Sequence, residues 1–97
     1  MEVINIKKIL IIEDDLSLSS GIAIALKDNE LSFVQAQDLN SARIQIKNTN
    51  FDLIILDINL PDGNGLDFLK ELRRNSTIPV IILTAKDMET DVVTGLE

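Results

Sequence analysis

Acidic and hydroxyl side chains stand at the ends of three apolar runs in the sequence. These are Glu13 and Asp14 after residues 8–12, Asp57 after residues 53–56, and Thr84 after residues 78–83. If the three runs are parallel strands of one sheet, their carboxyl ends lie at the edge where open α/β sheets bind ligands. Carboxylates that crowd together repel one another, so they must be neutralised by protons or by a cation. The sequence therefore predicts one oxygen-lined site.

The chemistry of this site follows from its donor atoms. Oxygen ligands without His or Cys favour a hard cation, and a site completed by waters and a phosphate favours Mg²⁺. The backbone carbonyl of Asn59, just beyond Asp57, could complete the ligand set. With the cation bound, a free oxygen of Asp57 is a possible nucleophile towards phosphorus. Thr84 could then donate a hydrogen bond to a phosphoryl oxygen.

Each residue, taken alone, also has an ordinary structural explanation. Glu13 and Asp14 could belong to a solvated turn that leads into a helix cap at Asp15, and Asp57 or Thr84 could cap the segment after its strand. Asp62 and Gly63 are more typical of a turn than of a ligand site. Only the coincidence at three strand ends favours a shared site, because short motifs taken singly give many false matches.

The elements that must position these residues follow from the apolar pattern. Strands are expected at residues 8–12, 30–36, 53–57 and 78–83, and helices at 16–28, from Asp38 or Asn40 to about 47, at 65–74 and from 88 onward. Pro61 and Gly63 predict a loop at residues 59–63. Alternating strands and helices with right-handed crossovers predict an α/β fold, a doubly wound parallel sheet with helices on both faces.

The composition excludes several classes of function. The 97 residues suffice for one domain, and 45% of them are hydrophobic, which is typical of a globular core. The net charge of −7, from 9 basic and 16 acidic residues, argues against direct binding of nucleic acid. The chain has no His for a phosphohistidine, no Cys, no nucleotide-binding phosphate loop, no signal peptide and no membrane span, so a cytoplasmic protein is the simplest expectation.

Three stretches resemble the receiver domain of two-component response regulators. They are Ile-Leu-Ile-Ile-Glu-Asp-Asp at residues 9–15, Asp-Leu-Ile-Ile-Leu-Asp-Ile-Asn-Leu-Pro-Asp-Gly-Asn-Gly at 52–65 and Pro-Val-Ile-Ile-Leu-Thr-Ala at 79–85. The Glu-Asp-Asp triplet and the Leu-Pro-Asp-Gly loop look most like the OmpR/PhoB-like subfamily, which carries a winged-helix DNA-binding domain downstream. The resemblance spans the whole chain, and the three motifs are specific in their order and spacing.

The resemblance implies a flavodoxin-like fold and a role for each site residue. Asp57 would accept a phosphoryl group from a sensor histidine kinase. Asp14 and Asp57 would bind Mg²⁺ directly, Glu13 through water and Asn59 through its carbonyl, and Thr84 would be the switch hydroxyl. The chain would then be a phosphoacceptor signalling domain rather than a classical enzyme. DNA would be bound only through a downstream domain that this chain does not contain.

The end of the chain departs from the family pattern. The family's fifth strand and helix, with the lysine that contacts the phosphoryl group, have no counterpart before Glu97, and Lys86 follows Thr84 too closely to be that lysine. The expectation is therefore an incomplete receiver domain over residues 1–97, with strand order 2-1-3-4. Residues 80–84 would form an exposed edge strand, which predicts a homodimer through this edge or through residues 88–97.

Two other functions remain open on the sequence. A phosphatase of the haloacid-dehalogenase type also uses a strand-end Asp with Mg²⁺, but its motif resembles Asp-x-Asp, and Asn59 cannot deliver a proton as a second carboxylic acid does. A receiver-like interaction module without phosphotransfer is the other alternative. The presence of Glu13, Asp14, Asp57 and Thr84 together argues against it.

Overall fold

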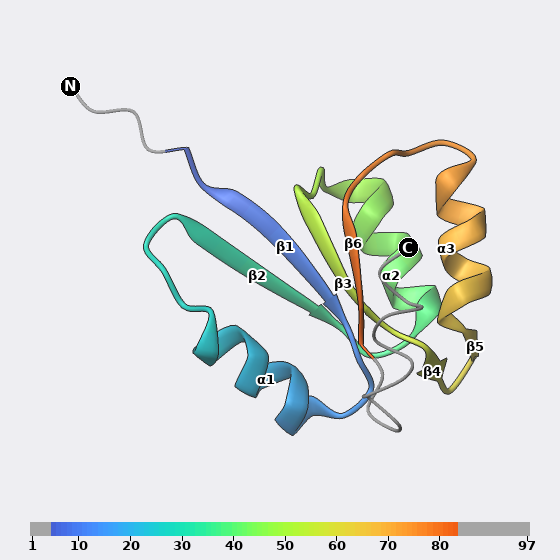
Figure 1. The fold of residues 1–97 in the computed structure, drawn as a ribbon, viewed down its shortest axis with the longest axis horizontal. Helices are drawn as coiled ribbons and strands as arrows, with labels where there is room; N and C mark the ends of the chain where they lie inside the picture. Colours follow the sequence, from blue (N-terminus) through green and yellow to red (C-terminus); the bar gives the residue numbers. More distant parts are fainter. Residues whose placement is uncertain (1–4, 84–97) are drawn as a thin grey trace.

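The computed structural model describes residues 5–83, and its central element is a parallel sheet. The strands are β1 (Lys7–Ile12), β2 (Leu31–Ala36), β3 (Leu53–Asp57) and β6 (Val80–Leu83), in the order β2-β1-β3-β6. All three pairings between neighbouring strands are parallel. The observed sheet confirms the predicted order of the first four strands and the doubly wound α/β class (Figure 1).

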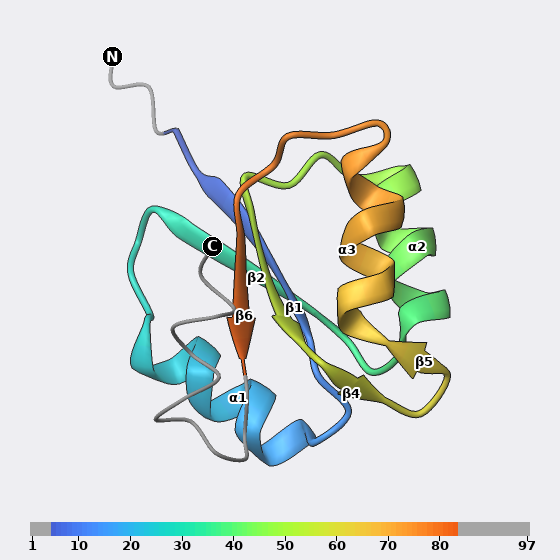
Figure 2. The same cartoon turned by 45° about the vertical axis from the view of Figure 1, so that its right-hand side comes forward.

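Helices cover both faces of this sheet. Helix α1 (Leu16–Ala25) lies on one face, and α2 (Leu39–Asn48) and α3 (Gly65–Arg73) lie side by side on the other (Figure 1, Figure 2). Each helix begins after a residue whose side chain accepts a hydrogen bond from a backbone N–H of the first turn, namely Asp15, Asp38 and Asn64. These caps satisfy N–H groups that have no partner inside a helix, so the helix starts are set by local sequence.

Two hydrophobic clusters hold the layers together, one on each face. Successive side chains of a strand point to opposite faces. Leu10 and Ile12 of β1 therefore belong to the cluster under α2 and α3, while Ile9 and Ile11 belong to the cluster under α1. All four residues are at most 4% exposed. The apolar run of β1 is continuous because both of its faces are buried.

Two predicted boundaries are wrong by a few residues. Helix α1 ends at Ala25 and not at residue 28, because the backbone leaves the helix at its C-cap, Leu26. Strand β6 begins at Val80 and not at residue 78. Pro79 has no N–H to give to the sheet, although its carbonyl still accepts from Ile54 N at 3.0 Å.

Helix α2 buries only some of its apolar side chains. Leu39 and Ala42 are buried and Ile46 packs against the core, in keeping with a spacing of three and four residues. Ile44 falls between these positions on the helix and is 54% exposed.

A short antiparallel hairpin replaces the loop expected at residues 59–63. Its strands are β4 (Asn59–Leu60) and β5 (Gly63–Asn64), with Asn59 opposite Asn64 and Leu60 opposite Gly63. Pro61 and Asp62 form the connecting turn, as their residue types predict. Gly63 has a φ of 156°, and a Cβ there would lie 2.8 Å from Leu39 Cδ1, so the position requires glycine.

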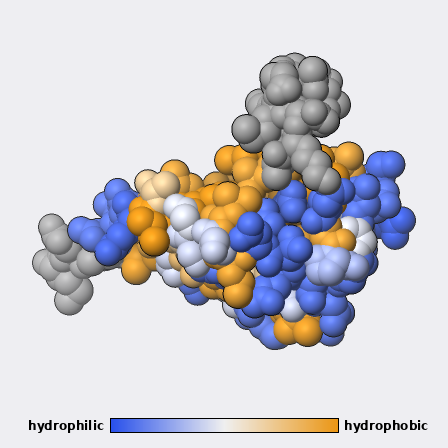
Figure 3. Space-filling model, turned by 90° about the horizontal axis from the view of Figure 1, so that it is seen from below, coloured by the Kyte–Doolittle hydropathy of each residue, from blue (hydrophilic) through white to orange (hydrophobic). Residues whose placement is uncertain are grey.

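The surface of α1 is unusually apolar. Its ten residues, LSLSSGIAIA, include no charged side chain, and Leu16, Leu18 and Ile24 are 50%, 39% and 73% exposed. Figure 3 shows hydrophobic areas among the hydrophilic residues on the underside of the molecule. No helix of residues 5–83 is long and apolar enough to cross a membrane. Thr84 and the helix predicted from residue 88 lie outside the described residues.

Candidate functional site

Three carboxylates meet at the carboxyl edge of the sheet. One carboxylate oxygen each from Glu13, Asp14 and Asp57 lies within 4.8 Å of the other two. Glu13 and Asp57 are buried, at 3% and 7% exposed, whereas Asp14 is exposed. The structure thus brings together the three acidic residues that the sequence placed at one site, with one side of the cluster open to solvent.

The pairing of β1 with β3 explains why these residues meet. Ile12 lies opposite Leu56 in the parallel register. The next residue is Glu13 after β1 and Asp57 in β3, so these two residues are neighbours across the two strands. The backbone N–H of Glu13 also donates to the carbonyl of Ala36 at the end of β2, at 3.0 Å, which continues the sheet by one residue.

Burial and mutual repulsion make the cluster hold protons more tightly than isolated carboxylates do. Burial is the largest cause that raises the pKa of Glu13 to about 7, and the charges of Asp57 and Asp14 raise it further. The N–H of Asp15 donates to Glu13 Oε2 at 3.0 Å and opposes this rise in pKa. At neutral pH, a positive charge would therefore stabilise the metal-free cluster.

The pKa of Asp57 is also raised, and burial is again the largest cause. Hydrogen bonds from the backbone N–H groups of Ile58 and Asn59 act in the opposite direction, because they favour the charged carboxylate. The charge of Asp14 raises the pKa of Asp57 further. A cation bound beside Asp57 would favour its charged form and so oppose the effect of burial.

The donor set fits a hard divalent cation. All of its atoms are carboxylate oxygens, and three negative charges gather within a small space. Magnesium prefers such oxygens and keeps several waters, and the exposed side at Asp14 leaves room for them. Asn59, the first residue of β4, lies two residues beyond Asp57, but Thr84 is outside the described residues.

Glycine is required where α3 begins, directly beside Asp57. A Cβ at Gly65 would collide with the carbonyl oxygen of Asp57. The N–H of Gly65 donates to the carbonyl of Ile58 at 2.6 Å. The backbone after the acidic strand therefore folds back tightly on itself, which ties the start of α3 to the site.

Asp62 makes a contact that the sequence did not reveal. The prediction of a turn at Asp62 and Gly63 was correct, but the Asp62 carboxylate also accepts from the backbone N–H groups of Leu39 and Asn40, at 2.8 and 2.9 Å. Those groups are 23 and 22 residues away in the sequence. No local pattern marks such a contact, and only the arrangement of β4, β5 and α2 shows it.

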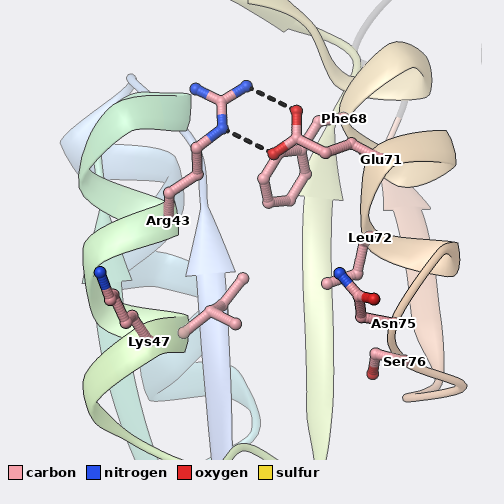
Figure 4. A pocket seen from close by; sticks show the side chains of 8 residues that line it. Arg43, Lys47, Phe68, Glu71, Leu72, Asn75 and Ser76 are labelled. Carbon is pink, nitrogen blue, oxygen red and sulfur yellow. Dashed lines mark hydrogen bonds and ion pairs between the residues drawn. The ribbon is translucent and has the colours of Figure 1, made fainter.

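A groove between α2 and α3 forms a second hollow, separate from the carboxylates. Its volume is about 370 Å³, and its lining comprises Arg43, Ile46, Lys47, Phe68, Glu71, Leu72, Asn75 and Ser76 (Figure 4). Arg43 donates two hydrogen bonds to Glu71, at 2.8 and 3.0 Å, and its guanidinium carbon lies 5.6 Å from the centre of the Phe68 ring. This groove contains none of Glu13, Asp14 and Asp57.

Comparison with known proteins places this arrangement among signalling domains. Residues 9–97 match the family described as "Response regulator receiver domain". The phosphate regulon transcriptional regulatory protein PhoB of Escherichia coli is 40% identical over 94 residues, which cover 94% of this chain and 41% of that protein. The KDP operon transcriptional regulatory protein KdpE of E. coli is 35% identical over 89 residues, covering 92% and 40%. The chain thus spans about two fifths of the length of these relatives.

Solved structures show the same fold. The receiver domain of the Francisella response regulator 1452 has a TM-score of 0.80 and 33% identity, covering 93% of this chain and 75% of that one. The response regulator TrrA of Thermotoga maritima, solved in complex with Mg(2+)-BeF, has a TM-score of 0.78 and 26% identity, covering 89% and 76%. The chemotaxis response regulator CheY4 of Vibrio cholerae has a TM-score of 0.78 and 25% identity, covering 94% and 80%.

Proposed function

This chain belongs to the response regulator receiver domain family, and we propose that Asp57 is its phosphoacceptor, with Glu13, Asp14 and Asn59 completing a Mg²⁺ site. One observation carries the proposal. The buried carboxylate of Asp57 ends a central strand and has the carboxylates of Glu13 and Asp14 within 4.8 Å. This set of oxygens is suited to a divalent cation and places a nucleophilic oxygen beside it.

The proposed reaction is transfer of a phosphoryl group to Asp57. A carboxylate oxygen of Asp57 forms a bond to phosphorus as the bond from phosphorus to the nitrogen of a phosphohistidine breaks. The N–H groups of Ile58 and Asn59 favour the charged form of this carboxylate, which is the form that acts as the nucleophile. Mg²⁺ held by Glu13, Asp14, Asp57 and Asn59 would offset negative charge on the phosphoryl oxygens.

Each remaining site residue has a proposed task. Asp14 would bind the cation directly, Glu13 would bind it through water, and Asn59 would contribute its backbone carbonyl. Thr84 would donate its hydroxyl hydrogen to a phosphoryl oxygen once Asp57 is phosphorylated. We therefore assign no conventional catalytic turnover to the domain beyond phosphotransfer and dephosphorylation at its own Asp57.

The proposed donor of the phosphoryl group is a sensor histidine kinase. The exposed apolar residues of α1 support a protein partner at this end of the molecule, because Leu16 follows closely on the acidic residues of the site. We propose that this reaction takes place in the cytoplasm, where a kinase that uses ATP would find its substrate. Since PhoB and KdpE are named transcriptional regulatory proteins, the proposed output is control of a DNA-binding domain elsewhere in the protein.

Acetyl phosphate and Mg²⁺ provide the test. The wild-type chain should gain one phosphoryl group by intact mass, and Asp57→Asn should gain none. Asp67→Asn is the matched control, because Asp67 is an exposed aspartate in the first turn of α3. An adduct on Asp57→Asn would place the nucleophile elsewhere. Rapid release of phosphate without a stable adduct would favour the phosphatase, and no reaction in the wild type would favour the interaction module.

We also propose that the edge of β6 pairs with a second copy of the chain. Among residues 5–83, β6 is hydrogen-bonded to β3 on one side and to no strand on the other. Backbone groups on such an edge can pair with another chain. Ile81 in this strand is 42% exposed, which adds apolar surface to the edge.

A further inference from the structure

Asp62 connects the hairpin that follows Asp57 to the start of α2. It lies in the turn between β4 and β5, and its two carboxylate oxygens accept from Leu39 N and Asn40 N at 2.8 and 2.9 Å. The N–H of Leu39 is the largest cause that lowers the pKa of Asp62. This carboxylate is therefore charged at neutral pH, as a contact with the positive end of a helix requires.

Helix α2 already has a cap of its own. Asp38 accepts from Ser41 N at 2.7 Å, which is the usual bond from an N-cap side chain. Asp62 satisfies two further N–H groups of the same helix start, those of Leu39 and Asn40, which Asp38 does not reach. Because Asp62 lies in a distant turn, its contact also gives the tip of the hairpin a fixed position.

This contact connects the two strand ends that supply the carboxylates by a second route. On one side, Glu13 N donates to Ala36 O at the end of β2, and the chain then runs two residues to Asp38 and into α2. On the other side, the hairpin runs from Asp62 back to Asn59. The two strand ends that supply the carboxylates are therefore joined both by the sheet and by the path through α2.

The hairpin transmits this contact to the site. Asn59 and Asn64 lie opposite each other at the open end of the hairpin, and Asn59 is only two residues beyond Asp57. A tip free to move would let Asn59 shift relative to Glu13 and Asp14, which stand on a different strand. A tip fixed to α2 keeps the distance from Asn59 to Glu13 and Asp14 constant.

We propose that Asp62 is a positioning residue for the cation site: its contact with Leu39 and Asn40 fixes the hairpin, and thereby holds Asn59 and Asp57 in register with Glu13 and Asp14. This inference rests on the proposed function, because it requires Mg²⁺ at the carboxylates. Residues that orient metal ligands without touching the metal commonly change metal affinity about 10- to 100-fold when they are replaced. The coupling is reciprocal, so Mg²⁺ should also strengthen the contact at α2.

Calorimetric titration with Mg²⁺ alone tests the inference on the 97-residue chain. Asp62→Ala should weaken Mg²⁺ binding about tenfold. Asp62→Asn keeps one acceptor oxygen in place and should give an intermediate affinity. Asp38→Ala is the matched control, because it removes an equal charge and a cap from the same helix without touching the hairpin. Its Mg²⁺ affinity should stay close to that of the wild type.

Amide hydrogen exchange in the wild type gives a second readout that needs no substitution. Mg²⁺ should slow exchange at Leu39 and Asn40 more than at Ser41, whose amide is held by Asp38 instead. Equal Mg²⁺ affinity in the wild type and Asp62→Ala would overturn the inference while leaving the proposed function intact. Equal losses of Mg²⁺ affinity in Asp62→Ala and Asp38→Ala would indicate that Asp62 acts only as a helix cap. If the wild type bound no Mg²⁺, the proposed cation site and this inference would both fail.

Discussion

At the scale of single residues, the carboxylates of the acidic cluster repel one another when no cation is bound, and this repulsion lowers the stability of the fold. Glu13 and Asp57 are buried next to each other and next to Asp14, and burial raises the pKa of both. Function and stability therefore conflict at this point in the molecule. The carboxylates that would hold a cation weaken the metal-free fold, as is common where binding sites are prepared in advance of their ligand.

Stability of the metal-free chain should consequently fall as the pH rises. Glu13 has a pKa of about 7 in the folded chain against 4.5 for the ordinary side chain. The folded state thus binds more protons than the unfolded state between these values, so its stabilisation is complete below about pH 4.5 and is lost as the pH passes about 7. The expected loss from Glu13 is about 2 to 3 kcal/mol in the free energy of unfolding.

Urea denaturation between pH 5 and pH 8 measures this loss. Glu13→Gln should flatten the pH dependence, whereas Glu30→Gln, at an exposed position, should not. Asp62 and Glu71 have lowered pKa values, so their contribution to stability is lost in the acid range, below the window chosen here. Addition of Mg²⁺ at pH 8 should restore stability to the wild type. A stability that rises from pH 5 to pH 8 in the metal-free wild type would contradict the assignment.

At the scale of elements, the strands followed from the sequence because their evidence is local and strong, whereas their order was implied by the resemblance to receiver domains. The runs around Leu10, Ile54 and Ile82 are continuous and aliphatic, and each is flanked by a helix start or a turn. Parallel order then brings Glu13 and Asp57 to the same edge with no further information. The short hairpin could not be predicted in this way, because strands of two residues have no periodicity to detect.

The contacts that complete the site are the ones that sequence reasoning missed. Asp62 reaches Leu39 across 23 residues, and the close approach of Gly65 to Asp57 depends on how α3 packs. Glycine and aspartate are common in turns for ordinary reasons. Their residue types therefore predicted the turn correctly but gave no sign of the long-range contacts that Asp62 and Gly65 make.

Two helical glycines should respond to alanine in opposite ways. Gly65→Ala places a Cβ against the carbonyl of Asp57, and it should destabilise the fold by more than about 1 kcal/mol. Gly21→Ala is the matched control in α1, where no atom lies within 4 Å of the added Cβ. It should stabilise the fold by about 0.5 to 1 kcal/mol, because alanine loses less backbone freedom in a helix. Thermal unfolding of both variants measures the two signs, and equal effects would argue against a close approach at Gly65.

At the scale of the whole molecule, the described sheet has two edges. Among residues 5–83, β2 pairs only with β1 and β6 only with β3. Strand β2 includes the polar residues Ser32 and Gln35, whereas β6 has no polar side chain. Strand β6, Val80–Leu83, is short and wholly aliphatic, with no charge or proline inside it to discourage pairing. Proteins usually protect such edges by one of those means.

We therefore expect the 97-residue chain to associate as a two-fold dimer, with β6 of one copy beside β6 of the other. A two-fold axis lets the same edge pair with itself and closes the assembly at two copies. Sedimentation velocity at several concentrations should show a monomer–dimer equilibrium. Ile81→Lys, which adds a charge to an exposed position of the edge strand, should shift the equilibrium towards the monomer.

Ile44→Lys is the matched control, because Ile44 is exposed to a similar degree, at 54% against 42% for Ile81. Ile44 belongs to helix α2 and not to the edge strand β6. The substitution should leave the equilibrium unchanged if the edge of β6 is the contact. A shift of equal size in both variants would indicate association through general hydrophobicity, and a wild-type monomer across the micromolar range would remove the dimer altogether. In a dimer formed through β6, Asp57 would lie on the strand next to the contact and beside the carboxyl end of β6, because Asp57 pairs with Leu83 in the register of β3 and β6. Phosphorylation with acetyl phosphate should then shift the sedimentation equilibrium, which Asp57→Asn would abolish.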